Sequence, residues 1–400
     1  MSSDDLDQLW RPFARRGDHY WDDRNGGPFG VHPPPYGPWH NLARLTTPAA
    51  DSSATAPAAV ERCAALGLAP DNGTARCSRI HWLHIPKTGT SFGTTIMRHG
   101  CPRIPHDAVA DDGAPIVSLT ERYPRTDRRW CDRGAFLGNL NGHDSVRYPH
   151  HRNRTVSMVR QPRARLLSEC NALTGEFRRA FGDRRAGRAR DDEGDAEGGR
   201  REWRKDSVYA EPFLREFLYS HGFSHGAIER LRVAWNRSPR GGALAGRRHI
   251  PLAACLALEG LKGCQTKMVL GLPCAAPIRL DARLLREAIR RLVHDFAFVG
   301  LTEAWEASVC LFHARLGGAP VAAQFLNGRP GSTERRDTPA LPSREIGELL
   351  EDEWDAAVYA AAKARFERDV AAARHAQRHG RAGCELPQRM AADGRCLAGA

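Results

Sequence analysis

Lysine is scarce in this chain of 400 residues, which carries only Lys87, Lys205, Lys262, Lys267 and Lys363. Arginine supplies the rest of the basic charge, and the formal net charge is +12. A basic surface suits nucleic acids, anionic glycans and acidic membranes equally well, and arginine is the better planar partner for phosphate and sulfate groups. The composition therefore indicates an anionic partner, or else a solvated surface that is merely biased toward arginine.

Metal-binding spacings of cysteine are also absent. The chain has 11 cysteines but no C-x-x-C pair, and its histidines do not cluster with cysteine. The common zinc-site patterns are therefore excluded. So many cysteines favour an oxidising compartment, although free cysteines also occur in cytosolic enzymes. Pairs such as Cys255–Cys264 and Cys384–Cys396 would close short loops, and the pairing stays open.

Long apolar runs are missing as well. No run of about 18 apolar residues occurs, which excludes the usual transmembrane helix pattern, and the first 20 residues lack the apolar core of a signal peptide. We expect membrane contact only through an anchor outside this chain. Three N-x-[ST] sequons, at Asn72, Asn153 and Asn236, offer glycosylation sites if the protein is secreted.

The chain divides by composition into three parts. Residues 1–76 are rich in Pro, Gly and Ala, which predicts a largely disordered N-terminal extension. Residues 77–375 have the apolar patterning of a folded domain, interrupted at 177–206 by a charged insert that we expect to be a loop. Residues 376–400 are interpreted as a C-terminal tail.

Short apolar strands alternate with amphipathic helices in the predicted domain. The pattern predicts strands at 79–85, 155–160 and 296–301, helices at 91–99, 163–173, 212–219, 281–295, 303–315 and 354–370, and a strand or short helix at 266–270. Such alternation is typical of an α/β fold with a parallel sheet, whose ligands bind at the carboxyl ends of the strands. We expect the turns after the three strands to face one site.

The first predicted strand leads into the turn "PKTGTS", residues 86–91, and then into a helix. Backbone N–H groups and the helix dipole would attract an anion there. Gly89 allows φ > 0, Thr90 and Ser91 bring hydroxyl groups, and Lys87 adds a compact charge. Because Lys87 precedes the glycine, the order differs from the G-x-x-x-x-G-K-[ST] loop that binds nucleoside triphosphates. The alternative is a capped turn with a surface lysine.

A second anion-binding pattern, "MVRQPRARLLSECN", follows the second predicted strand. Arg160 ends the strand, Pro162 fixes the turn, and Ser168 lies on the next predicted helix. Arg160 and Ser168 are therefore candidates to converge on a second phosphate. Taken alone, the segment is better interpreted as a helix start with exposed arginines, but the pair of patterns is more specific than either one.

Together, "HIPKTGTSF" and "VRQPRARLLSE" resemble two motifs of the Golgi carbohydrate sulfotransferases, in the branch of the heparan sulfate 2-O- and 6-O-sulfotransferases. The stretches "CQTKMVLG", "FVGLTEAWEASVCLF" and "DAAVYAAAKARFERD" resemble later motifs of that family. The resemblance spans about residues 80–370. It implies a sulfotransferase fold with a P-loop-like central parallel sheet flanked by helices, the cosubstrate 3′-phosphoadenosine 5′-phosphosulfate (PAPS, leaving the product PAP), and no metal.

The resemblance also implies roles for particular residues. The 5′-phosphosulfate would be held by Lys87, Thr88, Gly89, Thr90 and Ser91. The 3′-phosphate would be held by Arg160 and Ser168. The loop "FLNGRPGSTERR" corresponds to a family region that can cover the nucleotide, and it would contribute Arg329 and Ser332. The sequence departs from the family pattern at Gln161, where Asp is usual, and at Cys170, where an aromatic residue is usual.

The resemblance implies a base histidine between the two motifs, and the chemistry calls for a base because the acceptor hydroxyl must lose a proton. A histidine near its ordinary pKa suits this task. The interpretation favours His143 as the base, with His150 and His151 as alternatives. By analogy with phosphoryl transfer, Lys87 would act by stabilising charge on the departing phosphate oxygen.

The family resemblance implies a carbohydrate acceptor, an anionic glycan in particular, and residence in the Golgi lumen. The arginine-rich segments 122–133 and 178–204 would bind such a glycan or simply be solvated. No nucleic-acid partner is expected. Two other classes of function stay open: a P-loop NTP-binding protein or kinase, and a non-enzymatic protein that binds anions such as nucleic acid.

Overall fold

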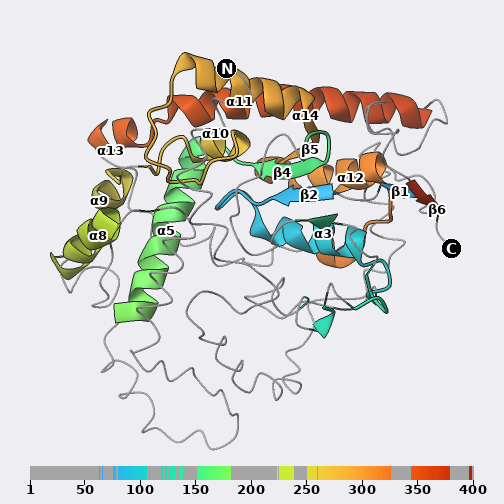
Figure 1. The fold of residues 1–400 in the computed structure, drawn as a ribbon, viewed down its shortest axis with the longest axis horizontal. Helices are drawn as coiled ribbons and strands as arrows, with labels where there is room; N and C mark the ends of the chain where they lie inside the picture. The colour runs from blue at the N-terminus through green and yellow to red at the C-terminus, as the bar shows by residue number, and fades with distance from the viewer. Residues whose placement is uncertain are drawn as a thin grey trace, which may run out of the picture.

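The fold is an α/β domain built on a parallel sheet flanked by helices (Figure 1). It is seen in a computed structural model that describes residues 63, 65, 75–77, 80–105, 108, 119, 122–124, 127–131, 136–137, 151–181, 223, 225–237, 250–258, 260–325, 344–378 and 396–398. The central sheet consists of β2 (Ile80–Leu83), β3 (Phe136–Leu137), β4 (Thr155–Val159) and β5 (Phe296–Leu301). The predicted α/β class is thus confirmed.

The sheet order is β3–β2–β4–β5, and each neighbouring pair is parallel. The chain passes from β2 to β3 on one side and then crosses to β4 on the other side of β2. The order therefore reverses between β2 and β4. In open α/β sheets a crevice forms at such a switch point, outside the carboxyl ends of the two strands.

Every residue of β2, β4 and β5 is buried, as expected for strands covered on both faces. The helix after β2 begins as a 3₁₀ turn, η2 (Thr90–Phe92), and continues as α3 (Gly93–Gly100). Phe92 stacks on Phe298 of β5 with ring centroids 5.8 Å apart, and both rings meet Phe312 edge-on. This aromatic cluster fixes the start of the helix against the sheet.

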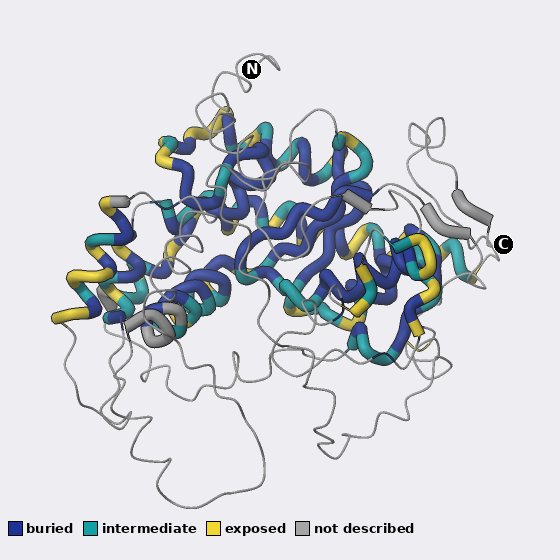
Figure 2. The backbone as a smooth tube through the Cα atoms, turned by 60° about the horizontal axis from the view of Figure 1, so that its bottom comes forward, coloured by how far each residue is buried: buried dark blue, intermediate teal, exposed yellow. Residues whose placement is uncertain are grey.

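Helices cover both sides of the sheet (Figure 1). In that view α11 (Ala282–His294) and the long α14 (Glu353–Arg378) lie above the strands, and α3 lies below them. η3 (Thr302–Ala304) and α12 (Trp305–Leu316) follow β5. Asp281 caps α11 by accepting a 2.8 Å hydrogen bond from the Leu284 N–H. Figure 2 shows buried residues running through the strands and the inward sides of these helices.

A second apolar cluster lies beside the sheet, around α5 (Pro162–Phe181). It includes α8 (His225–Arg237), α9 (Leu252–Leu256) and the end of α13 (Arg344–Leu349). The predicted helix at 163–173 is therefore longer than expected, and the prediction of a loop at 177–181 is wrong. Leu173 and Phe177 are both buried four residues apart, so the apolar side of the helix continues.

Four disulfides cross-link the described part of the chain: Cys63–Cys310, Cys101–Cys131, Cys170–Cys255 and Cys264–Cys274. The suggested Cys255–Cys264 pairing is wrong, because Cys255 on α9 faces α5 while Cys264 begins α10 (Cys264–Val269). Cys170 stands where the sulfotransferase motif that this segment resembles usually has an aromatic residue, and here it forms a disulfide with Cys255. Cys384 lies outside the described residues.

A small antiparallel pair joins regions expected to be the extension and the tail. β1 (Ala75–Cys77) pairs with β6 (Cys396–Ala398), and the register places Cys77 opposite Cys396. All three predicted sheet strands are confirmed, as are the helices beginning near residues 91, 163, 281, 303 and 354. Residues 266–269 belong to the helix α10, and Leu270 is its C-cap. The predicted helix 212–219 lies outside the described residues, and the structure adds α8, α9 and α13, which the pattern did not predict.

Candidate functional site

The turn after β2 carries five of the predicted site residues. The Thr88 hydroxyl donates to the Ile85 carbonyl at 2.8 Å and its N–H contacts the same oxygen at 3.4 Å, which closes the turn. Lys87 has φ 63° and Gly89 has φ 108°. Thr90 opens the 3₁₀ turn that leads into α3. The first N–H groups of a helix have no acceptor within it, so this turn presents donors to an anion.

Gly89 is required by space as well as by its φ angle. A Cβ atom placed there would lie 2.9 Å from Cζ3 of Trp305, the first residue of α12. The indole N–H of Trp305 donates to the Gln324 carbonyl at 2.9 Å, so the ring is held in place. The backbone of the turn thus lies directly against an aromatic surface, and only glycine fits.

The turn after β4 brings Arg160 to the first turn. Its guanidinium donates to the Lys87 carbonyl at 3.2 Å. Its backbone N–H donates to the Gln265 side-chain oxygen at 2.9 Å, and its carbonyl accepts from the Gln265 side-chain nitrogen at 2.9 Å. The sequence-predicted pair of turns therefore meets at the switch point between β2 and β4.

Burial lowers the pKa of Arg160, and the nearby Glu303 carboxylate opposes that shift while Arg165 adds to it. A guanidinium keeps its proton at neutral pH even so. Glu303 also accepts a 2.8 Å hydrogen bond from the Gln161 N–H, and Tyr359 on α14 donates its hydroxyl to Glu303 at 3.4 Å. The half-buried arginine therefore remains a charged donor at the edge of the sheet.

The turn after β5 joins the other two. The Thr302 hydroxyl donates to the Thr88 carbonyl at 2.6 Å and contacts the Val159 carbonyl at 3.2 Å. One side chain thus ties together the carboxyl ends of β2, β4 and β5. The three turns therefore lie together at one edge of the sheet, as expected, and whether they form one binding site stays a prediction.

Other predicted site residues lie elsewhere or outside the described part. Ser168 is half-buried on the second turn of α5, and no described contact joins it to Arg160. His151 precedes β4 and packs on His81, with ring centroids 4.0 Å apart. It thus lies at the end of the sheet opposite Arg160, separated from it by the length of β4, roughly 16 Å at 3.3 Å per residue. The remaining candidates, His143, His150, Arg329 and Ser332, fall outside the described residues.

Several polar residues of the site were missed from the sequence. His84 is buried and its Nε2 lies 3.0 Å from the Thr90 hydroxyl, beneath the turn. Gln265, Thr302 and Glu303 make the contacts described above. Gln265 lies in "CQTKMVLG", and Thr302 and Glu303 lie in "FVGLTEAWEASVCLF". Because both stretches resemble family motifs, the resemblance is the sequence signal that could have identified these residues.

A pocket of about 900 Å³ lies outside the three turns. It is lined by Gly260, Lys262, Lys267, Ile278, Arg279, Leu280, Asp281, Glu353 and Trp354. Within the described ranges no cluster of three potential metal ligands occurs. None of the helices that the structure describes is long and apolar enough to cross a membrane.

Comparison with protein-family models, with curated proteins and with solved structures finds no match for this chain. The case for any function therefore rests on the motifs and on the geometry of the three turns.

Proposed function

We propose that this chain is a sulfotransferase that transfers the sulfuryl group of PAPS to a hydroxyl group of a carbohydrate, with an anionic glycan as the acceptor class. The observation that supports it most directly is the 3.2 Å contact between the Arg160 guanidinium and the Lys87 carbonyl. It joins the turn that resembles a 5′-phosphosulfate loop to the turn that resembles a 3′-phosphate motif. Both anions belong to one PAPS molecule, so a shared site requires the two turns to be adjacent.

The residues of the turns fit the charges of PAPS. Lys87 and the first N–H groups of the helix that opens at Thr90 would hold the 5′-phosphosulfate. Arg160 would hold the 3′-phosphate through its planar donors, and Ser168 remains a candidate there. Once bound, PAPS supplies the sulfuryl group, and Lys87 would stabilise negative charge on the phosphate oxygen from which that group departs.

The backbone of Lys87 supports a functional role for the turn. Among the described residues only Lys87 and Asn153 have a positive φ without being glycine. Such a conformation costs about 1–3 kcal/mol and persists where the surroundings enforce it, often at functional sites. Arg160 and Thr302 enforce it here, because they bond the carbonyl groups of Lys87 and Thr88.

The acceptor hydroxyl must give up a proton, and His143 is the proposed base. It precedes β4 in the chain and lies outside the described residues. His151 is the weaker alternative because it packs on His81 at the far end of β4. The parallel sheet with its anion-binding turn also supports assigning the chain to the sulfotransferase fold, and the disulfides fit the proposed Golgi location.

The proposal is tested by nucleotide binding followed by transfer. Isothermal titration would compare PAP, 5′-AMP, ATP with Mg²⁺ and a DNA duplex, and radiolabelled sulfate transfer from PAPS would be measured on a panel of glycans. Lys87→Ala and His143→Ala are the test variants. Lys363→Ala is the matched control, because Lys363 is an exposed lysine on α14 that forms a 3.9 Å ion pair with Glu367.

We expect PAP to bind more tightly than 5′-AMP, and wild type and Lys363→Ala to transfer sulfate. Lys87→Ala should lose transfer, and His143→Ala should lose transfer while keeping PAP binding. Tighter binding of ATP with Mg²⁺ would instead indicate an NTP-binding protein. Salt-dependent DNA binding without PAP affinity would indicate a non-enzymatic anion-binding protein.

A further inference from the structure

We propose that Gln265 is a positioning residue, which holds Arg160 in the orientation needed to recognise the 3′-phosphate of PAPS. This inference rests on the proposed function and adds a specificity determinant to it. Gln265 lies on α10 and its side chain is fully buried. It is 105 residues away from Arg160 in the sequence, yet the oxygen and the nitrogen of its side-chain amide both form hydrogen bonds with the Arg160 backbone.

The Gln265 side-chain amide continues the hydrogen bonding of β4 by one residue past the end of the β4–β5 pairing. The β4–β5 ladder ends where Val159 pairs with Leu301, so Arg160 is the first residue past it. There the Gln265 side chain accepts from the Arg160 N–H and donates to the Arg160 carbonyl, each at 2.9 Å. A primary amide that bonds both groups of one residue fixes the orientation of that backbone. The direction in which the Arg160 side chain leaves the sheet is thereby set.

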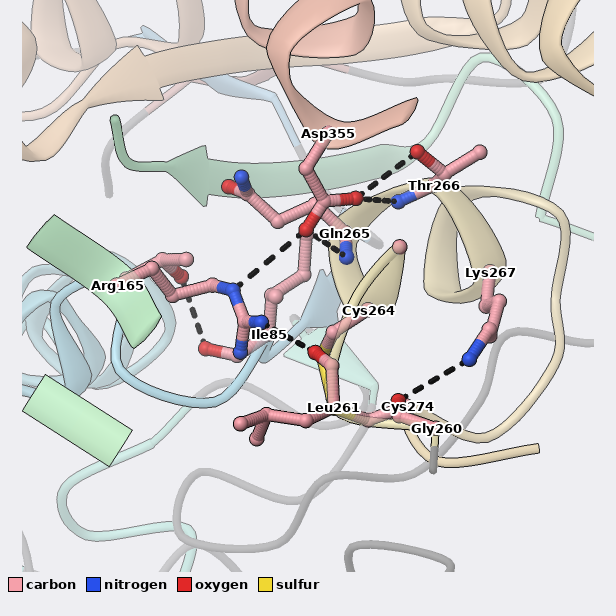
Figure 3. The surroundings of a disulfide bond; sticks show 12 residues. Ile85, Arg165, Gly260, Leu261, Cys264, Gln265, Thr266, Lys267, Cys274 and Asp355 are labelled. Atoms are coloured by element: carbon pink, nitrogen blue, oxygen red, sulfur yellow. Dashed lines mark hydrogen bonds and ion pairs between the residues drawn. A yellow bond between two sulfur atoms is a disulfide. The ribbon is translucent and has the colours of Figure 1, made fainter. Parts of the chain in front are cut away.

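The segment around Gln265 is held by two anchors, the Asp355 carboxylate and a disulfide (Figure 3). Its backbone N–H donates to Asp355 at 3.1 Å, and the following residue, Thr266, donates to the same carboxylate through its N–H and hydroxyl at 2.9 Å each. The preceding residue, Cys264, forms the disulfide with Cys274. The start of α10 is therefore a fixed base, so the position of the Gln265 amide is set before any nucleotide binds.

This arrangement predicts a defect confined to one phosphate. Without the amide, the Arg160 backbone would be free to rotate and its guanidinium would leave the position set for the 3′-phosphate. The turn after β2 keeps its own contacts, which include the Thr302 hydroxyl on the Thr88 carbonyl. Recognition of the 5′-phosphate should therefore survive while the preference for a 3′-phosphate is lost.

The test is the ratio of affinities for PAP and 5′-AMP, which differ only in the 3′-phosphate. Gln265→Leu keeps the size and removes both hydrogen bonds. We expect its PAP affinity to fall about 10- to 100-fold, the factor for weakened hydrogen bonding to a charged group, with 5′-AMP affinity changed less than about twofold. Thr155→Val is the matched control: it removes a 3.0 Å hydrogen bond from a threonine hydroxyl to the His151 carbonyl at the opposite end of β4, and it should keep the wild-type ratio.

Gln265→Glu gives a second readout that does not depend on the folding of the leucine variant. A protonated carboxyl group again offers one donor and one acceptor, whereas a carboxylate offers acceptors only. The PAP to 5′-AMP ratio of this variant, normalised to wild type at the same pH, should therefore rise from pH 7.5 to pH 5.5.

The outcomes separate the two proposals. A wild-type ratio in either folded Gln265 variant at pH 7.5 overturns the positioning role alone. A loss of 5′-AMP affinity equal to the loss of PAP affinity also overturns it, because the effect would then be general. If wild type itself binds PAP no better than 5′-AMP, the proposed function fails and the positioning role falls with it.

Discussion

The ion pair between Arg165 and Asp355 lies beneath the candidate site and offers the sharpest test of its architecture. Both side chains are fully buried, with Nε of Arg165 3.5 Å from Oδ2 of Asp355 (Figure 3). The carboxylate also accepts hydrogen bonds from the Gln265 N–H and from the N–H and hydroxyl of Thr266. The guanidinium donates to the Leu261 carbonyl at 2.6 Å, while its Nε and one terminal nitrogen make no hydrogen bond in the described structure.

These contacts predict an unequal cost for removing the two partners. Asp355→Asn leaves a buried positive charge with one hydrogen bond, and breaking a buried pair in this way costs about 3–5 kcal/mol of unfolding free energy. Arg165→Met leaves a carboxylate that still accepts hydrogen bonds from three other groups. We therefore expect a smaller loss of unfolding free energy, of about 1–3 kcal/mol. The double variant removes both charges and should be more stable than Asp355→Asn alone.

The assay is guanidinium chloride unfolding without reductant, followed by circular dichroism, on wild type, both single variants and the double variant. Gln265 depends on Asp355, so PAP binding of each folded variant is measured alongside. The reasoning would be refuted by an Arg165→Met cost equal to or larger than that of Asp355→Asn. It would also be refuted by additive effects in the double variant, which would show that the two charges do not interact.

Two further predictions follow from single features of the structure. Gly89→Ala should cost about 1–3 kcal/mol of unfolding free energy, measured by denaturation, and should weaken PAP binding, because of the positive φ and the 2.9 Å approach to Trp305; wild-type values for both would contradict it. Burial, and then the charge of Asp355, raises the pKa of Asp352 from 3.8 to about 6. The folded state then binds more protons than the unfolded state between those values, so this group makes stability fall as the pH rises from about 4 to about 6. Asp352→Asn should reduce that fall in pH-dependent unfolding, and an unchanged slope would count against the shift.

Three of the four strands of the central sheet (β3 was not predicted) and the helices packed on it could be predicted because their signals are local. Strands such as 296–301 are continuous apolar runs bounded by polar residues, and helix 281–295 shows a regular apolar side with Asp281 as its cap. The turn "PKTGTS" was found for the same reason, since its glycine, lysine and hydroxyl groups are adjacent in sequence. A parallel sheet then implies that such turns share an edge, and the contact between Arg160 and Lys87 agrees with this.

The polar contacts beneath the site could not be predicted, because they join residues far apart in the sequence. Arg165 is one of several arginines in its stretch of sequence, and nothing local indicates that it is buried against Asp355. The disulfides posed the same difficulty: Cys255 has Cys264 nearby in sequence, but pairs with Cys170 across 85 residues because α5 and α9 pack together.

The order of the strands explains how one site can be built from such distant segments. The order reverses between β2 and β4, and in open α/β sheets a crevice forms outside the carboxyl ends at such a point. A site that recognised the two phosphates of the proposed cosubstrate would have to hold the two turns at a fixed separation. Thr302 supplies that rigidity from β5 and Gln265 supplies it from α10, each by bonding backbone groups at the strand ends. The half-buried side chains proposed to bind the anions, Lys87 and Arg160, are therefore positioned by buried residues behind them.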